Sequence, residues 1–166
     1  MSEELIAMTS TETTSPDHAG VIAHPPLIYL LALIAGVALD AAWPLPLLDN
    51  VLQFWIGGGV IAVSLVIAIS AFLTFHRVGT SVPTNTPTTA LAMTGPYRYS
   101  RNPIYVALSL LYAGIAIAAD NVLMLALLVP VLLIMNYGVV IREERYLARK
   151  FGADYLDYKK RVRRWV

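Results

Sequence analysis

Long runs of apolar residues limit the folds open to this chain more than any other feature. The hydrocarbon core of a bilayer is about 30 Å thick, and a helix needs roughly 20 apolar residues to cross it. The runs that approach or meet this length are residues 27–43, 51–75, 104–119 and 122–141. Asp40 is the only Asp, Glu, Lys or Arg inside them. We therefore predict an all-α, polytopic membrane protein with about four transmembrane helices.

The overall composition supports this fold class. The chain is 57% hydrophobic and 14% charged, whereas soluble domains carry about 25% charged residues. The absence of cysteine excludes a disulfide framework, a thiolate zinc site and a cysteine nucleophile. We predict no metal site.

The connections between the apolar runs differ in character. Residues 44–50 form a short turn, and Asp120 with Asn121 forms a very tight one, which predicts an antiparallel hairpin of 104–119 and 122–141. Residues 76–103 form a long polar connector, and such connectors are usually functional or disordered. Residues 1–24 are rich in Ser, Thr and acidic residues. We expect 1–24 to be mobile and 25–166 to form a single domain.

The basic residues indicate the orientation. The chain has twelve Lys and Arg. They are Arg77, Arg98 and Arg101 in the connector and the nine that lie from Arg142 to Arg164. Cytoplasmic loops carry an excess of such residues. We therefore expect both segments and both termini on the cytoplasmic side of an inner or plasma membrane.

The C-terminal tail has the pattern of an amphipathic helix. Gly152 is a possible break, and the apolar residues around and beyond it step by four and three positions, as on one helix face. These are Phe151, Tyr155, Tyr158, Val162 and Trp165. Such a basic, aromatic helix lies in the membrane interface or docks on the protein's own cytoplasmic loops and closes a site. We do not expect nucleic-acid binding, because anionic lipid is the nearer partner.

The first of two polar clusters covers residues 95–105, at the expected cytoplasmic end of a span. Asn102 is a good N-cap and Pro103 a good first helical residue, and the arginines and tyrosines of the cluster suit a membrane boundary. These structural roles explain the cluster without a site. However, a helix N-terminus with Arg101 beside it is also suited to bind a carboxylate or a phosphate.

The second cluster is Glu143-Glu144, at the end of the last span. Placing a carboxylate at a membrane boundary costs free energy, so such residues usually have a functional role. Adjacent helical residues point about 100° apart, so one can face the bundle while the other forms a salt bridge outward. The hairpin makes Arg101 and Glu143 neighbours. An anion site, a carboxylate and several tyrosines together complement an amino acid with an onium centre, such as S-adenosylmethionine.

The two clusters and the tail together resemble the membrane methyltransferases that include isoprenylcysteine carboxyl methyltransferase and phosphatidylethanolamine N-methyltransferase. That superfamily has Gly-Pro-Tyr, Arg-His-Pro-x-Tyr-x-Gly, then a hydrophobic hairpin, Glu-Glu and Phe-Gly-x-x-Tyr-x-x-Tyr. The corresponding residues here are Gly95-Pro96-Tyr97, Arg101-Asn102-Pro103-Ile104-Tyr105, Glu143-Glu144 and Phe151-Gly152-Ala153-Asp154-Tyr155-Leu156-Asp157-Tyr158. Asn102 replaces the histidine, as in the phospholipid N-methyltransferase form, and Ala107 replaces a glycine, which is expected to crowd the cofactor.

The resemblance implies an S-adenosylmethionine-dependent enzyme that methylates a lipid or lipophilic molecule at the cytoplasmic boundary. The acceptor could be an amine, a thiol or a carboxylate. By resemblance, Arg101, Asn102, Glu143 and Glu144 are the catalytic candidates. The cofactor would contact these four and the remaining motif residues, namely Gly95, Pro96, Tyr97, Pro103, Tyr105, Tyr155 and Tyr158.

Two other functions remain open from the sequence. A small four-helix transporter would normally carry an ionisable residue within a span, and only Asp40 comes near this. A non-catalytic membrane scaffold would leave Arg101, Asn102 and the two glutamates without a common task.

Overall fold

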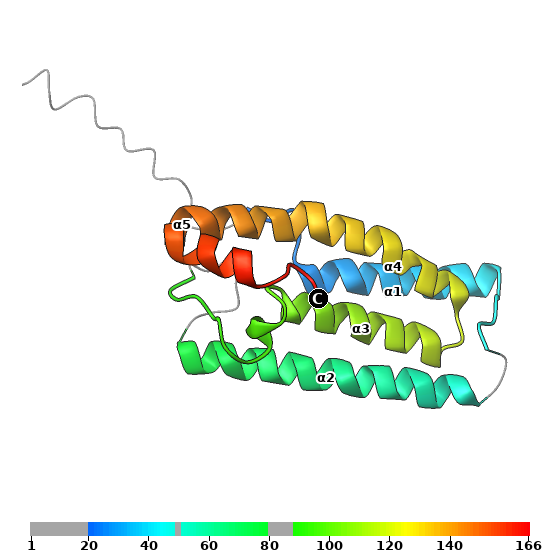
Figure 1. The fold of residues 1–166 in the computed structure, drawn as a ribbon. Helices are drawn as coiled ribbons and strands as arrows, with labels where there is room; N and C mark the ends of the chain where they lie inside the picture. Colours follow the sequence, from blue (N-terminus) through cyan, green and yellow to red (C-terminus); the bar gives the residue numbers. More distant parts are fainter. Residues whose placement is uncertain (1–19, 49–50, 80–87) are drawn as a thin grey trace, which may run out of the picture.

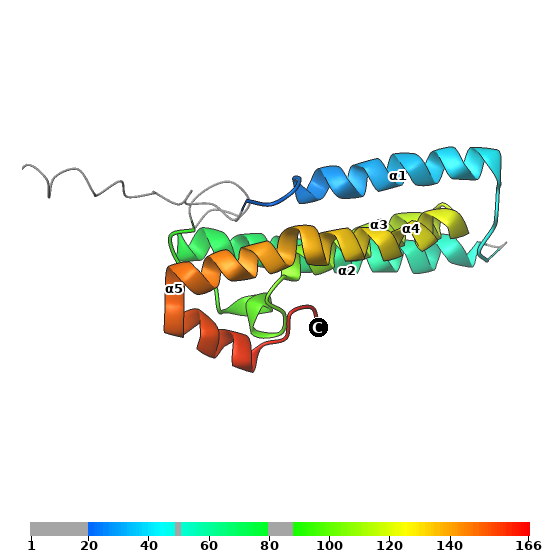
Figure 2. The same cartoon turned by 90° about the horizontal axis from the view of Figure 1, so that it is seen from above.

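The protein is a bundle of long helices lying side by side. The computed structural model describes residues 20–48, 51–79 and 88–166. The α-helices are α1 (Pro25–Ala42), α2 (Leu52–Val78), α3 (Pro103–Ala118), α4 (Val122–Ile134) and α5 (Ile141–Arg161). A π-helix, η2 (Met135–Val140), joins α4 to α5, and a 3-10 turn, η1 (Gly95–Arg98), precedes α3. Figures 1 and 2 show α3 between α2 and α4, with α1 beside α4.

The prediction of a polytopic helical membrane protein is confirmed. Among the described residues, three helical stretches are long and apolar enough to cross a bilayer, namely Pro25–Ala42, Leu52–Val78 and the continuous stretch Val122–Arg161. The helix expected over 104–119 is shorter and apolar, and runs from Pro103 to Ala118. It contacts α1, α2 and α4, so it is the central helix of the bundle.

Close contact between α2 and α3 depends on small residues. A Cβ atom added to Gly57 would lie 2.6 Å from the Ala118 nitrogen and 2.7 Å from the Gly114 carbonyl oxygen. Small residues let helix backbones approach in membranes, where packing rather than water drives association. Ser64 adds a hydrogen bond from its hydroxyl to the Ala107 carbonyl oxygen, at 2.7 Å.

The predicted hairpin between α3 and α4 is present, and its turn is stabilised by two side chains. Asp120 has a positive φ of 54°, and its Oδ1 accepts hydrogen bonds from the backbone N–H groups of Leu47 and Leu48. Asn121 caps α4 by accepting from the Met124 N–H at 2.7 Å. The turn thus also holds the connection between α1 and α2.

The π-helix changes which side chains share a face of the last helix. Asn136 and Glu144 are eight residues apart, which on a regular α-helix leaves them about 80° apart. The wider π turn reduces this offset, and Arg164 contacts both side chains. The Gly138 carbonyl oxygen accepts a hydrogen bond from the Ile22 N–H at 3.3 Å. Residues 1–19 of the segment expected to be mobile lie outside the described residues, whereas 20–24 contact the bundle.

The tail folds back on the bundle, as Figure 2 shows. Gly152, the predicted break, has φ 51° and ψ −124° inside α5. The expected helical face extends too far, because the helix ends at Arg161 and Val162 is extended. The chain leaves the helix there to form a parallel bridge between Arg163 and Ser100. Of the two alternatives for the tail, docking on the protein's own loops describes the structure.

The glycine contact predicts a difference in stability between two adjacent variants. Gly57→Ala should lower the free energy of unfolding relative to Gly58→Ala by about 1–3 kcal/mol, as overpacking does. Gly58 is the matched control, because a Cβ there meets nothing within 4 Å and both variants gain the same helix propensity. Unfolding in mixed micelles measures the difference. Equal stability would contradict the close α2–α3 contact.

Candidate functional site

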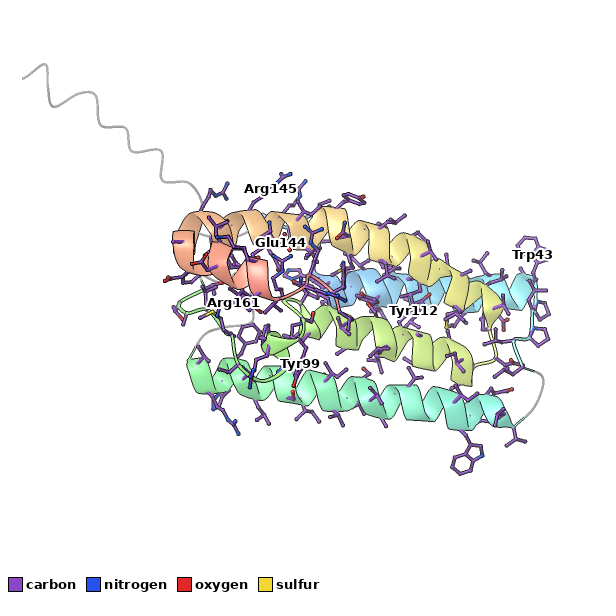
Figure 3. All side chains as sticks on the ribbon, in the orientation of Figure 1. Trp43, Tyr99, Tyr112, Glu144, Arg145 and Arg161 are labelled. Carbon is purple, nitrogen blue, oxygen red and sulfur yellow. The ribbon has the colours of Figure 1, made fainter. Side chains whose placement is uncertain are left out.

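A pocket with mainly apolar walls and a few charged groups lies at the end of the bundle where η1, the start of α3 and the polar part of α5 meet. Figure 3 shows Glu144, Arg145 and Arg161 at this end and Trp43 at the opposite end. The cavity has a volume of about 70 Å³. It is lined by Phe75, Thr88, Ala90, Leu91, Ala92, Tyr97, Arg101, Asn102, Ile104, Tyr105, Glu143, Glu144, Leu147, Tyr155 and Tyr158.

Arg101 brings an incompletely satisfied positive charge to the pocket. Its side chain is 7% exposed, and its Nη2 lies 2.9 Å from Glu144 Oε1. Its Nε and Nη1 are buried and have no hydrogen-bond partner among the described residues. Buried polar groups are normally hydrogen-bonded, and charged ones without a partner are costly. These two donors therefore mark a place for an anionic group of a ligand.

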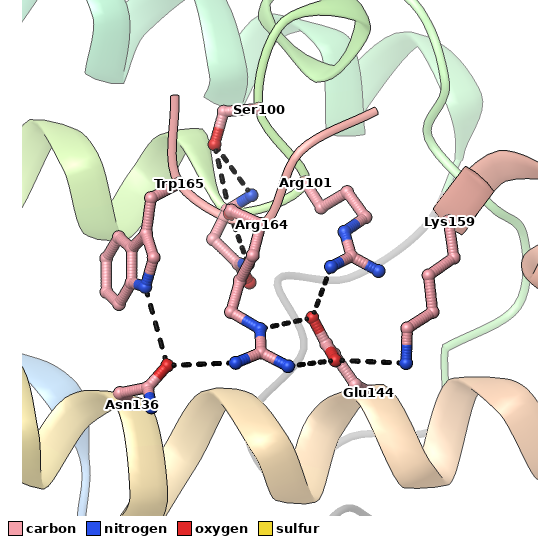
Figure 4. A network of polar contacts seen from close by, with 8 residues as sticks. Ser100, Arg101, Asn136, Glu144, Lys159, Arg164 and Trp165 are labelled. Atoms are coloured by element: carbon pink, nitrogen blue, oxygen red, sulfur yellow. Dashed lines mark hydrogen bonds and ion pairs between the residues drawn. The ribbon is translucent and has the colours of Figure 1, made fainter. Parts of the chain in front are cut away.

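Glu144 is the centre of an ionic cluster (Figure 4). Its carboxylate oxygens accept from Arg164 Nε and Nη2, both at 2.9 Å, and lie 2.9 Å from Arg101 Nη2 and 3.5 Å from Lys159 Nζ. Burial alone would raise the pKa of Glu144, but Arg164, Arg101 and Lys159 outweigh it and hold the pKa below its usual value. Glu144 is therefore ionised and already neutralised by the protein.

Glu143 has the opposite environment. It is 5% exposed, and its Oε1 accepts a hydrogen bond from the Tyr105 hydroxyl at 2.7 Å. Burial raises the pKa of Glu143 to about 8, although the bond from Tyr105 works against this. Its neutral form is therefore favoured at pH 7.

One expectation about the glutamates needs correction. Arg101 and Glu143 line the same pocket, as expected of neighbours, and Arg101 forms its ion pair with Glu144. Neither carboxylate points outward, because Arg164 reaches Glu144 from the extended C-terminal segment and lets it remain 6% exposed.

Aromatic side chains form another wall of the pocket. Tyr97, Tyr155 and Tyr158 are buried, and the Phe75 and Tyr97 rings meet edge to face at 5.1 Å. The Tyr158 hydroxyl donates to the Tyr97 carbonyl oxygen at 2.8 Å and so ties the tail to η1. Burial raises the pKa of each of the three tyrosines, so all three hydroxyls stay protonated. Aromatic faces attract cations.

The C-terminal segment fixes the start of α3. The Arg101 N–H donates to the Arg163 carbonyl oxygen at 2.9 Å, and Asn102 Nδ2 donates to that of Arg164 at 2.8 Å. Asn102 occupies the N-cap position of α3, but its side chain forms no cap hydrogen bond. The predicted capping role is therefore wrong, since the amide is used to bind the tail. Pro103 has no N–H, so the anion site depends mainly on the Arg101 side chain.

The structure brings most of the predicted site residues together. Those that line the pocket are Tyr97, Arg101, Asn102, Tyr105, Glu143, Glu144, Tyr155 and Tyr158. Gly95, Pro96 and Pro103 do not line it. Gly95 has φ 58°, and a Cβ there would lie 2.7 Å from Thr74 Oγ1, so it shapes η1. Ala107 does not line the pocket, and its carbonyl oxygen accepts a hydrogen bond from Ser64 of α2.

Sequence reasoning missed several residues of the site. Phe75, Leu147, Thr88 and residues 90–92 line the pocket, but these apolar and small residues belong to no recognisable motif. Arg164 was not identified because it belongs to a run of basic residues, and such a run is equally typical of a segment at the membrane surface.

Comparison with known proteins gives a family match over this region. Residues 52–154 match the family model described as phospholipid methyltransferase. A stretch of 63 residues is 35% identical to an uncharacterized protein of Haemophilus influenzae, covering 38% of this chain and 100% of that protein. The family match includes Arg101, Tyr105, Glu143 and Glu144, and ends just before Tyr155.

The environment of Glu143 predicts a pH dependence of stability. Its folded pKa is about 8 and its ordinary value is 4.5, so the unfolded chain loses this proton at lower pH than the folded chain. The contribution of Glu143 to stability is present below about pH 4.5 and is lost as the pH rises towards 8. Glu143→Gln keeps an acceptor for Tyr105 and removes the titration.

The measurement is the thermal unfolding midpoint of both proteins in detergent between pH 5 and 8.5. The stability of Glu143→Gln relative to the unchanged protein should increase through this range, because all other groups cancel in the difference. A difference that does not change with pH would contradict the buried, neutral carboxyl.

Proposed function

Because the chain belongs to the phospholipid methyltransferase family, we propose that it transfers a methyl group from S-adenosylmethionine to a lipophilic acceptor at the cytoplasmic boundary of the membrane. The single observation that carries this proposal is the pair of buried, unpartnered nitrogens of Arg101 in a pocket walled by tyrosines. The acceptor group is an amine, a thiol or a carboxylate.

The residues present fit the chemical groups of this cofactor. The free nitrogens of Arg101 suit its carboxylate, since guanidinium binds carboxylates through paired hydrogen bonds. The aromatic faces of Tyr97, Tyr155 and Tyr158 suit its positive sulfur. Of the two glutamates, Glu143 suits the amino group or a ribose hydroxyl, because Glu144 already binds three cations. When bound, the cofactor supplies a methyl group activated by the sulfonium charge.

The protein itself would align the reactants, exclude water and provide one carboxyl group, that of Glu143, whose protonation can change. Holding two reactants in line supplies several kcal/mol of a transfer barrier, up to about 7–11 in the best cases. Phe75 and the tyrosines keep the pocket dry. A positive ligand beside Glu143 favours its ionised form, and Tyr105 holds this carboxyl in place. For an amine or thiol acceptor, Glu143 is then the group that receives the proton.

The size of the cavity implies that a wall moves. At about 70 Å³ the cavity is smaller than the 300–1,000 Å³ of ordinary ligand pockets. The part of α5 beyond Gly152 carries Tyr155 and Tyr158, and the non-helical backbone of Gly152 separates it from the rest of the helix. We infer that this part swings away to admit the cofactor.

The polar end of the bundle supports the proposed orientation. Arg145 and Arg161 of α5 lie at the same end of the bundle as the pocket residue Glu144 (Figure 3). The positive-inside rule places this end in the cytoplasm, where a soluble cofactor is available. Asp40, the residue that the transporter alternative would use, is half-buried near the end of α1 opposite the pocket.

The test is calorimetric binding of S-adenosylmethionine and S-adenosylhomocysteine to the purified protein in detergent and in lipid nanodiscs. Both should bind saturably, and Arg101→Ala should weaken binding about tenfold or more, because a hydrogen bond to a charged group contributes about 1.5–3 kcal/mol. Arg163→Ala is the matched control, since this side chain is exposed and its carbonyl is retained. A folded protein that binds neither compound in either medium would contradict the proposal.

A further inference from the structure

Arg164 lies beside the pocket without lining it. Its Nε and Nη2 donate to Oε1 and Oε2 of Glu144, both at 2.9 Å, and its Nη1 donates to Asn136 Oδ1 at 3.2 Å. Figure 4 shows the guanidinium between these two side chains. All three nitrogens of Arg164 therefore donate to the protein itself, and any influence of this side chain on the pocket passes through Glu144.

The backbone of Arg164 is anchored separately from its side chain. The Arg164 carbonyl oxygen accepts from Asn102 Nδ2 at 2.8 Å and from Ser100 Oγ at 3.4 Å. The parallel bridge between Ser100 and Arg163 holds the preceding residue. None of these contacts uses the Arg164 guanidinium. A change of the Arg164 side chain therefore leaves these anchors of the C-terminal segment in place.

Arg164 and Arg101 share the same carboxylate unequally. Arg164 pairs with both oxygens of Glu144, whereas Arg101 reaches only Oε1, through Nη2 at 2.9 Å. Guanidinium groups prefer to pair with a carboxylate through two parallel hydrogen bonds. Without Arg164, both oxygens would be open to Arg101, and a second nitrogen of Arg101 would turn to Glu144. That nitrogen is one of the two donors that have no partner in the protein.

Lys159 does not replace Arg164 in this respect. Its Nζ lies 3.5 Å from Glu144 Oε2, and its side chain is 44% exposed. An ammonium group is a point charge and lacks the planar pair of donors that matches a carboxylate. The two-point pairing of Glu144 with Arg164 is therefore the contact that limits Arg101 to one hydrogen bond.

We propose that Arg164 is a positioning residue, which pairs with both oxygens of Glu144 and thereby keeps two nitrogens of Arg101 available to the ligand. The inference rests on the proposed function in one respect, namely that this ligand is S-adenosylmethionine. The alternative is that the Arg164 side chain only anchors the tail. The two roles differ in what happens when Glu144 is neutralised as well.

Calorimetric binding of S-adenosylhomocysteine to the full-length protein in detergent tests this difference. Arg164→Gln should weaken binding about tenfold, as expected for the loss of one hydrogen bond to a charged group. Adding Glu144→Gln should restore the affinity to within about threefold of the unchanged protein, because Arg101 then has no carboxylate to turn to. Such a gain in the double variant is a coupling between the two sites. A double variant that binds as weakly as Arg164→Gln would overturn the proposal.

Two further variants separate two-point pairing from charge. Arg164→Lys keeps the positive charge but cannot pair with both oxygens, so it should weaken binding threefold or more. Arg163→Gln is the matched control for charge, because it removes the same charge from the adjacent, exposed side chain, and its affinity should stay within twofold. Full affinity in Arg164→Lys, or an equal loss in Arg163→Gln, would show an effect of charge alone and contradict the proposal.

The state of Arg101 can also be observed without cofactor. In ¹⁵N-labelled protein in micelles, the side-chain N–H signals of Arg101, assigned with Arg101→Lys, should shift in Arg164→Gln and stay in place in Arg163→Gln. Unshifted signals would overturn the proposal whatever the calorimetry shows. Shifted signals in a protein that binds neither S-adenosylmethionine nor S-adenosylhomocysteine would support the competition for Glu144 and refute the proposed function.

Discussion

The ionic cluster on Glu144 is the interaction on which the rest of the site depends. Three cations from segments distant in sequence meet at one carboxylate: Arg101 before α3, Lys159 beyond the bend of α5, and Arg164 in the extended C-terminal segment. Detaching the tail would remove Lys159 and Arg164 from the buried Glu144 carboxylate, and leaving a buried charge without its partners is costly. The cluster therefore holds the tail on the bundle. It also uses only one nitrogen of Arg101, and the other two remain available to a ligand.

The membrane explains why the site is built at one end of the bundle. Charged groups are costly within the hydrocarbon, so the ionisable residues of the site lie just beyond the spans. The π-helix connects the membrane-spanning part of the last helix to the site. It brings Asn136, near the lipid, and Glu144, in the pocket, within reach of the same Arg164 side chain.

Features that depend on local sequence were predictable. The spans follow from hydrophobicity, the hairpin from Asp120-Asn121, and the bend from Gly152. The pocket residues Arg101, Tyr105, Glu143 and Glu144 were identified by their spacing and resemblance. Features set by tertiary contact were not predictable. Whether Arg101 pairs with Glu143 or Glu144 depends on the position of Arg164, and the end of the last helix depends on the bridge between Arg163 and Ser100.

The most direct test of the account is an experimental structure of the protein with S-adenosylhomocysteine bound. We expect the ligand carboxylate to lie within hydrogen-bond distance of Arg101 Nε and Nη1, while Arg164 remains paired with Glu144. We also expect Tyr155 and Tyr158 to line the bound ligand in a pocket wider than the one described above. A carboxylate bound elsewhere, with the two Arg101 nitrogens still without a partner, would contradict the account.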